Sequence, residues 1–409
     1  MRRRLFTSAA VFGCILILPV GVVNATDQPA LTALVRTVLD DNPRVLAARS
    51  ALDAAQAREK AADQPLYNPD IDIEYEDAGD VTKTLELSQS IDWGDKREAR
   101  TRVATLEQAR AVAELAGIRQ GLAIELLAAL VGYHTASELT ALAEQRRILM
   151  QRFLSLTEQR LQAGDLGQVA LDLARLADTE ANLQLARLRG DQAEAEQALT
   201  AIVDAGAGDW PTLPEMPATT LFDAENIDAL LEQLPALQVV HSEIAAARAA
   251  VDLSRRERRA DPTIGLRGGR EASENMIGLT LSIPLFVRNN FSAEVDAASA
   301  DAIQIEQNAH NLYRASRAQL ISTARRFELG RQAWDDWQQT GQTSLESQTQ
   351  LLERLWQAGE LSTADYLVQI KQTLDTRTAA AELRGSLWQV WFEWLAASGR
   401  TESWLGLKD

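Results

Sequence analysis

Cysteine and histidine are nearly absent from this sequence of 409 residues, which contains one cysteine and three histidines. The cysteine, Cys14, lies in an apolar run that follows three arginines and ends in a small-residue cleavage motif, so residues 1–25 are predicted to be a signal peptide. A retained membrane anchor is the alternative, since the run is nearly long enough to span a bilayer. The position of Cys14 inside the run does not favour its lipidation. The mature chain then has no cysteine, which excludes disulfides and thiolate metal sites.

Catalytic motifs are also absent. The sequence contains no nucleophile elbow and no phosphate-binding loop. The three histidines are far apart in the chain, and we interpret each of them as a surface or packing residue instead of a metal ligand. They are His134, His241 and His310. Neither an enzyme nor a bound cofactor or metal ion is therefore predicted.

Positive charge is scarce. Lysine and arginine number 41 against 58 aspartates and glutamates, which gives a net charge of −17, and removal of the three arginines in the signal peptide makes it −20. Because phosphate binding needs a basic face, nucleic acid is excluded as a partner. After residue 26 no apolar stretch approaches the roughly 18 residues of a membrane helix, so no further membrane-spanning helix is expected.

An internal repeat is the main feature that the sequence does contain. A nearly constant offset between matching residues indicates duplication. We predict repeat one over residues 26–203, a linker rich in Gly and Pro over 204–221, repeat two over 222–400, and a tail over 401–409. Four pairs of matching residues lie 192 to 195 positions apart: Pro43 and Pro235, Pro69 and Pro262, Ser90 and Ser282, and Gly164 and Gly359.

Each repeat is predicted to begin with a helix that is broken by proline, followed by an alanine-rich helix and a β-hairpin. The hairpins cover about residues 70–91 and 263–285, with turns at 77–80 and 268–275. Apolar and polar residues alternate along the strands, so that each hairpin has one apolar and one polar face. Four strands are too few to close a barrel, so the sheet must either pack on the helices or close with other subunits. The polar residues of the first strand are all acidic: Asp70, Asp72, Glu74 and Glu76.

Long helices make up the rest of the chain. At 1.5 Å per residue, about 65 residues form one helix, or two stacked helices, roughly 100 Å long. Gly164 and Gly359 mark the points where the chain reverses, because glycine adopts a left-handed turn conformation without a steric penalty. The predicted fold is mainly α with a small β part, dominated by two long antiparallel helical hairpins. The segments with helical periodicity are 95–160 and 290–357 for the long helices, and 168–201 and 363–397 for the returning ones.

The order of these motifs resembles that of the outer-membrane efflux proteins of the TolC family. The resemblance depends on the repeated order of helix, β-hairpin and long helix, on the segment Leu279–Phe286, and on the repeated tip sequence Ala-Gly-(Asp/Glu)-Leu. It covers nearly the whole mature chain. Within the family, Ser88–Arg97 is similar to the corresponding segment of the heavy-metal cation branch, the CzcC-like proteins.

The resemblance implies a homotrimer in the outer membrane with a large periplasmic part. Four strands per chain would contribute to a twelve-stranded β-barrel surrounded by outer-membrane lipid, and the helical hairpins would form a periplasmic α-barrel. The trimer would be the exit duct of a tripartite efflux system. It would receive its substrate from an inner-membrane pump of the resistance-nodulation-division type and a periplasmic adaptor. The cargo would be metal cations or small toxic compounds, with organic drugs and secreted proteins left open because the pump selects the cargo.

The resemblance also implies functional residues. Relatives dock the adaptor with the tips of their helical hairpins, which match Ala163, Gly164, Leu166, Ala358, Gly359 and Leu361. A gate acid close to the tips matches Asp365 and, in repeat one, Asp172. The strand acids would line the lumen and favour cations: Asp70, Asp72, Glu74 and Glu76. From the residues alone, the two glycines could simply be helix caps, and the acids could be ordinary hydrated surface residues.

A periplasmic helical scaffold or adaptor of a transport complex is the alternative from another class. Such a protein would also contain long helical hairpins, but it does not require two β-hairpins that each have an apolar outer face. Dependence on detergent and a heat-modifiable trimer in outer-membrane fractions would distinguish the channel from the scaffold.

Overall fold

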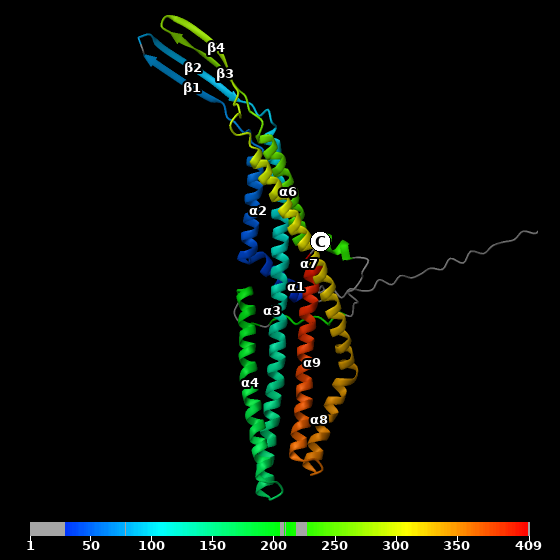
Figure 1. The fold of residues 1–409 in the computed structure, drawn as a ribbon. Helices are drawn as coiled ribbons and strands as arrows, with labels where there is room; N and C mark the ends of the chain where they lie inside the picture. The colour runs from blue at the N-terminus through cyan, green and yellow to red at the C-terminus, as the bar shows by residue number, and fades with distance from the viewer. Residues whose placement is uncertain (1–28, 78, 205–207, 209, 218–226, 408–409) are drawn as a thin grey trace, which may run out of the picture.

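The computed structural model describes residues 29–77, 79–204, 208, 210–217 and 227–407. The predicted signal peptide, residues 1–25, lies outside the described residues, and the linker is described only in part. The molecule is elongated, with a β-sheet at one end and the tips of two helical hairpins at the other (Figure 1). The first half contains α1 (Pro29–Asp41), α2 (Pro43–Ala62), β1 (Asp70–Asp77), β2 (Val81–Ser90), α3 (Lys96–Gln162) and α4 (Gln168–Val203).

The second half repeats this order of elements. It contains α5 (Ile227–Glu232), α6 (Pro235–Glu257), β3 (Thr263–Glu271), β4 (Glu274–Ser282), α7 (Ser292–Asp336), the π-helical turn η2 (Trp337–Gly341), α8 (Gln342–Gln357), α9 (Thr363–Ser398) and α10 (Thr401–Trp404).

One proline near the start of each half is the first residue of a helix. Pro43 and Pro235 are the first residues of α2 and α6, where the missing backbone N–H of proline costs nothing. The Asn42 side chain caps α2 by accepting a hydrogen bond from the backbone N–H of Arg44 at 2.9 Å.

α3 is one continuous helix of 67 residues, which at 1.5 Å per residue is roughly 100 Å long. By length and composition alone α3 could cross a membrane, although no such helix was expected from the sequence. It is the central helix of the molecule and packs against α2, α4, α6 and α9. These contacts bury its apolar residues, including Leu122, Leu126 and Leu130.

The counterpart of α3 in the second half is interrupted. The segment predicted as a helix from 290 to 357 is divided into α7 and α8 by η2. Gly341 is the last residue of this π-helical turn and lies directly against the Trp337 ring. A Cβ on Gly341 would lie only 2.2 Å from a ring carbon. The interruption was not predicted, since the helical spacing of apolar residues continues on both sides of it.

The four strands form one antiparallel sheet in the order β1-β2-β3-β4. β2 pairs with β3, so the sheet joins the two halves of the chain, with Leu87 opposite Leu266. The predicted turn at 268–275 is too wide, because β3 continues to Glu271 and β4 begins at Glu274. Gly268 and Gly269 lie inside β3 instead of in the turn. At Gly269 the reason is close approach of the neighbouring strand, since a Cβ there would lie 2.2 Å from the Lys83 carbonyl oxygen.

The apolar face of the sheet does not pack on the helices. Figure 1 shows the strands projecting beyond the ends of α2 and α6. The side chains of Ile73, Ile277 and Leu279 are 80%, 87% and 82% exposed. The four strands were predicted either to pack on the helices or to close with other subunits. The first arrangement is not seen, because the helices of the chain leave the sheet uncovered. The other exposed apolar residues of this face are Ile71, Tyr75, Leu85, Leu87, Ile264, Leu266 and Leu281.

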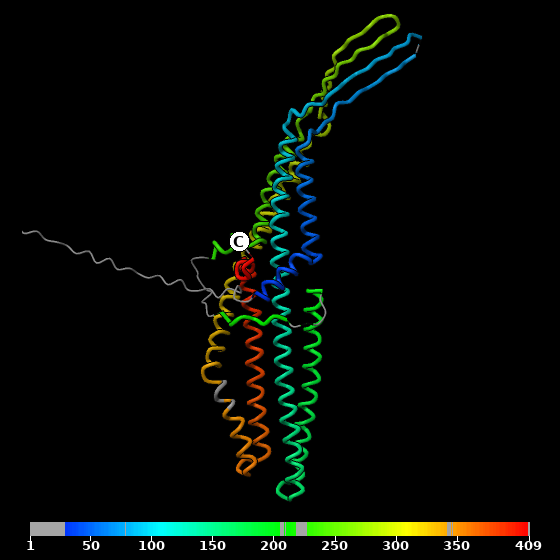
Figure 2. The backbone as a smooth tube through the Cα atoms, turned by 180° about the vertical axis from the view of Figure 1, so that it is seen from behind, coloured from blue at the N-terminus to red at the C-terminus, as the bar shows by residue number. Residues whose placement is uncertain are grey.

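The main hydrophobic core lies near the middle of the molecule's length, where Figure 2 places both α1 and the C-terminal residues. It combines buried residues of α1, α3, α9 and α10. The end of the chain belongs to this core, because Trp404 and Leu405 are buried. Residues 401–407 are thus packed, although the sequence was interpreted as a tail from 401.

A buried ion pair attaches the sheet to the helices. The Asp261 carboxylate, just before β3, accepts hydrogen bonds from Lys96 Nζ at 2.8 Å and from the Tyr67 hydroxyl at 2.6 Å. The side chains of Asp261 and Lys96 are only 7% and 13% exposed. Because Tyr67 and Lys96 flank the first β-hairpin and Asp261 precedes the second, the pair connects the bases of both hairpins.

Candidate functional site

The two hairpin tips have the same backbone geometry. Gly164 and Gly359 adopt left-handed conformations, with φ of +81° and +76°. The N–H of Asp165 donates to the Arg160 carbonyl at 2.9 Å, and the N–H of Glu360 donates to the Leu355 carbonyl at 2.9 Å. These are Schellman caps, in which a left-handed glycine closes the end of a helix.

The predicted docking residues lie at one end of the molecule. Both tips are at the end farthest from the sheet (Figure 1). Ala163, Gly164, Ala358 and Gly359 are exposed, whereas Leu166 and Leu361 are half-buried. A Cβ on Gly164 would meet nothing within 4 Å, and one on Gly359 would meet only the Arg160 guanidinium at 4.0 Å. The tips therefore present backbone and small side chains that no described residue covers.

An aromatic cluster holds the two tips together. Phe153 of α3 packs against Trp356 of α8 and Tyr366 of α9, with ring centroids 4.7 and 5.1 Å away, and Trp356 stacks on Tyr366 at 5.3 Å. Burial raises the pKa of the Tyr366 hydroxyl to about 12. This cluster was not predicted from the sequence, although Trp356 and Tyr366 both lie close to Gly359 in the chain.

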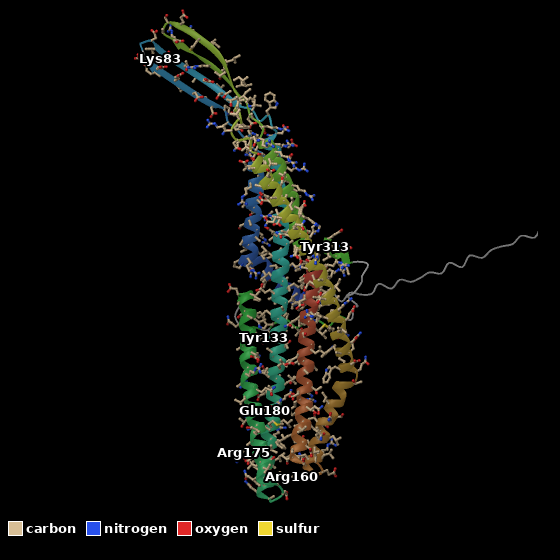
Figure 3. The ribbon with its side chains drawn as sticks, viewed as in Figure 1. Lys83, Tyr133, Arg160, Arg175, Glu180 and Tyr313 are labelled. Carbon is tan, nitrogen blue, oxygen red and sulfur yellow. The ribbon has the colours of Figure 1, made fainter. Side chains whose placement is uncertain are left out.

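Arg160 adds a second connection between the tips. Its Nη1 donates to the Trp356 carbonyl at 3.0 Å, and its guanidinium lies 5.4 Å from the centre of the Trp356 ring. Arg160 belongs to α3, so this contact crosses from the first helical hairpin to the second, close to the turns (Figure 3).

The predicted gate acid Asp365 lies in the first turn of α9, and Asp172 lies just after the first turn of α4. The Asp365 carboxylate accepts a hydrogen bond from the Ser362 hydroxyl at 2.6 Å, and its backbone N–H donates to that hydroxyl at 3.1 Å. Ser362 is therefore the N-cap of α9, and its hydroxyl also holds the Asp365 carboxylate. Asp172 accepts a hydrogen bond from the Gln168 amide at 2.9 Å in α4. Both acids are exposed, and a gating role for them stays a prediction.

A charged network further along the helices was not predicted. Arg146 of α3 donates to Asp375 of α9 at 3.1 Å and lies 3.7 Å from Glu180 of α4. Lys371 of α9 donates to Glu180 at 2.7 Å and lowers the pKa of that carboxyl. The network therefore joins the two helical hairpins above the tips, near the position of Glu180 in Figure 3. Its members are too far apart in sequence for a local motif to reveal them.

The four strand acids share the polar face of the sheet and are all exposed. Glu74 accepts hydrogen bonds from the Thr84 hydroxyl at 3.1 Å and from the Arg267 guanidinium. Asp70, Asp72 and Glu76 form no ion pair within the described part of the chain. Among the residues that the structure describes, no group of three or more His, Cys, Asp or Glu side chains could hold a metal ion. This face could attract cations but contains no site that would retain one.

Comparison with known proteins connects these features to one family. A family model described as "Outer membrane efflux protein" matches residues 34–204. The chain is 28% identical over 325 residues to the cobalt-zinc-cadmium resistance protein CzcC of Cupriavidus metallidurans, covering 75% of this chain and 76% of that protein. It is 25% identical over 334 residues to the nickel-cobalt-cadmium resistance protein NccC of Alcaligenes xylosoxydans xylosoxydans, covering 75% and 74%.

The fold matches solved outer-membrane channels. The CmeC outer-membrane channel of Campylobacter jejuni superposes with a TM-score of 0.78 at 14% identity, over 98% of this chain and 94% of that one. The resemblance to the TolC family and the predicted fold class are thus confirmed. The family is one of channels and not of enzymes. Residues 34–204 match the outer-membrane efflux protein family and the whole chain has the fold of outer-membrane channels, in agreement with a location in the outer membrane with a large periplasmic part.

Proposed function

We propose that three copies of this chain close one β-barrel and one helical tunnel, and that the trimer exports metal cations. The observation that carries the proposal is the sheet, whose exposed apolar face lies opposite a face containing four acids. An apolar outside and a polar inside are what a barrel in lipid requires. Four strands with two unpaired edges need further strands to close, because open sheet edges do not occur in a bilayer.

Metal cations are the proposed cargo for two reasons. The first is the names of the relatives CzcC and NccC, which are metal resistance proteins. The second is the row of unpaired carboxylates at Asp70, Asp72 and Glu76, which would give the lumen a negative potential and concentrate cations. A duct should pass ions without holding them, so a lining without a retaining site fits this role.

Proteins of this family work with an adaptor and a pump. For this chain we propose that the periplasmic adaptor docks on the tip residues Ala163, Gly164, Leu166, Ala358, Gly359 and Leu361. The exposed glycines and alanines would allow close approach of an adaptor backbone, and the two leucines would supply apolar contact. An inner-membrane pump of the resistance-nodulation-division type would deliver the cations.

Removal of three strand acids tests the cargo proposal. The variant Asp70→Asn/Asp72→Asn/Glu76→Gln leaves the Glu74 ion pair in place. We expect roughly a threefold lower resistance to cobalt, zinc and cadmium in cells that depend on this protein, because about 0.6 kcal/mol of attraction is lost at the lumen wall. Growth at graded metal concentrations measures the effect, with an organic dye as the comparison cargo.

The matched control removes the same number of acids from α7, in the variant Glu294→Gln/Asp296→Asn/Asp301→Asn. It should retain full resistance. If the strand variant also retains full metal resistance, the strand acids are only a hydrated surface. If wild-type cells resist the dye but none of the three metals, the proposed cargo is wrong.

Replacement of a gate acid tests the periplasmic constriction. We expect Asp365→Asn to roughly halve the cation conductance of the channel in a planar bilayer at low salt, because three copies around one axis would lose three negative charges. The difference should vanish near 1 M salt, where the Debye length is about 3 Å. Asparagine can still accept the hydrogen bond of the Ser362 hydroxyl, and its backbone N–H is unchanged, so the N-cap of α9 is kept.

The control for the gate is Glu360→Gln, which removes an exposed acid from the adjacent turn. It should leave the conductance unchanged, and Asp172→Asn should give a smaller decrease than Asp365→Asn. An unchanged current for Asp365→Asn at every salt concentration would remove Asp365 from the gate.

A further inference from the structure

A polar row crosses the outer end of the otherwise apolar sheet face. Tyr75, Lys83, Arg270 and Asn275 are register partners on β1, β2, β3 and β4. They lie on the same face as Ile73 and Leu85, because alternate residues of a strand share a face. Figure 3 places Lys83 at the far end of the sheet, away from the helices. We call Lys83 and Arg270 the basic pair.

The basic pair is electrostatically unfavourable in the isolated chain. Lys83 and Arg270 lie directly opposite each other on antiparallel strands, and like charges in this position destabilise a sheet. Both side chains are exposed, and neither forms an ion pair or a hydrogen bond with the residues that the structure describes. The nearest acid on this face is Asp77, one row further out. In a chain with 58 acidic residues, two unpaired and adjacent cations indicate an anion from outside the chain.

A gap in the apolar surface adjoins the basic pair. The next row inwards consists of Ile73, Leu85, Gly268 and Ile277, so β3 contributes no side chain there. The nearest heavy atom to a Cβ on Gly268 would be a backbone oxygen 4.0 Å away, which means that the position is open. The pair of cations therefore lies beside a shallow apolar notch between Leu85 and Ile277.

The spacing of apolar residues places the basic pair at the outer boundary of the membrane. From Asn275 inwards, alternate positions of β4 and the following segment remain apolar as far as Leu285. These ten positions span about 33 Å along an extended chain, which at a tilt of about 40° is about 25 Å of height. That is the height of the apolar band of an outer-membrane barrel. The helices lie at the inner end, so the polar row lies at the level of the outer-leaflet headgroups.

We propose that the basic pair binds the phosphate group of a phosphorylated glycolipid of the outer leaflet, with one acyl chain lying in the notch at Gly268. Both cations point to the lipid side and belong to the two inner strands, so the site is complete within one chain. Tyr75 completes an interfacial arrangement, since Lys83 Nζ lies 5.5 Å from the centre of its ring. The inference rests on the outer-membrane location and not on the proposed cargo.

Lipid retention by the full-length protein tests this site. The wild type and the variant Lys83→Gln/Arg270→Gln are purified from outer membranes in mild detergent, and native mass spectrometry counts the phosphorylated lipid A retained per trimer. We expect the double variant to bind phosphorylated lipid A roughly 10- to 30-fold more weakly than the wild type does. Each cation near an anionic lipid surface contributes about 1 kcal/mol to the binding free energy. Lipid A from which both phosphates have been removed should bind the wild type as weakly as phosphorylated lipid A binds the variant.

The matched control is Arg175→Gln/Arg187→Gln, which removes two exposed cations from the periplasmic helix α4. It should retain as much lipid as the wild type, whereas Gly268→Leu should lower retention by filling the notch while keeping both charges. Equal retention by the wild type and the Lys83/Arg270 variant would overturn the proposal. The proposal would also be overturned if the wild type bound phosphate-free lipid A as strongly as phosphorylated lipid A. Metal resistance is measured in a separate experiment. If the proposed cargo is wrong, the lipid-retention measurement still tests the basic pair.

Discussion

Replacement of Gly359 by leucine should lower both crosslinking to the adaptor and metal resistance at least about tenfold. The position has φ of +76°, where a residue with a Cβ costs about 1–2 kcal/mol. The leucine would also project from an exposed turn onto which the adaptor is proposed to dock. A steric cost of about 1.4 kcal/mol at the contact reduces affinity tenfold. Crosslinking in cells and growth with metal measure the two effects.

Two companion variants separate the bulk of the side chain from the backbone conformation. Gly190→Leu places the same side chain on an exposed position inside α4, where a Cβ meets nothing within 4 Å and φ is helical. It should crosslink and export as the wild type does. Gly359→Asn keeps the left-handed conformation at low cost, so it should retain more docking than leucine. Unchanged crosslinking and full export by Gly359→Leu would show that Gly359 is a helix cap and nothing more.

The parts of the fold that follow from local patterns were predictable. The alternation of Ile71, Ile73 and Tyr75 with acids indicated a strand with two faces, and the exposed apolar face confirmed it. The glycines of the tip sequences marked the reversals, because a left-handed turn is a local property of the backbone. The nearly constant offset between the two repeats then indicated that the two tips are equivalent. The offset could not show that both tips lie at the same end of the molecule.

Contacts between distant segments were not predictable. Arg146 and Asp375 are 229 positions apart, and neither residue differs from an ordinary helical surface residue in its own neighbourhood. The turn of the second hairpin was predicted too wide for a related reason. Gly268 and Gly269 look like turn residues locally, but at Gly269 the requirement comes from Lys83 on another strand. Likewise, the tryptophans of the C-terminal segment share one hydrophobic core with residues of α1, and no local pattern relates these distant segments.

Truncation of Trp356 should have the largest effect on the periplasmic end. The side chain is 2% exposed and contacts Phe153, Tyr366 and the Arg160 guanidinium. Its indole N–H also donates to the Thr363 hydroxyl at 3.3 Å. Truncation of a buried aromatic residue costs about 3–5 kcal/mol. Because this cost falls on the contact between the two hairpins, we expect amide protection in α8 and the start of α9 to decrease about a hundredfold or more.

Hydrogen exchange of the trimer in detergent measures this loss, with Trp93→Ala as the matched control. Trp93 is 71% exposed, so the same truncation there should leave protection of the tips unchanged. Trp356→Phe keeps part of the ring stack and should give an intermediate result. If Trp356→Ala exchanges no faster than Trp93→Ala, the tips are held by the charged network of Arg146, Glu180, Lys371 and Asp375 instead. If it exchanges faster and also loses adaptor crosslinking, docking requires both tips to be held in register, because the substitution leaves every proposed contact residue in place.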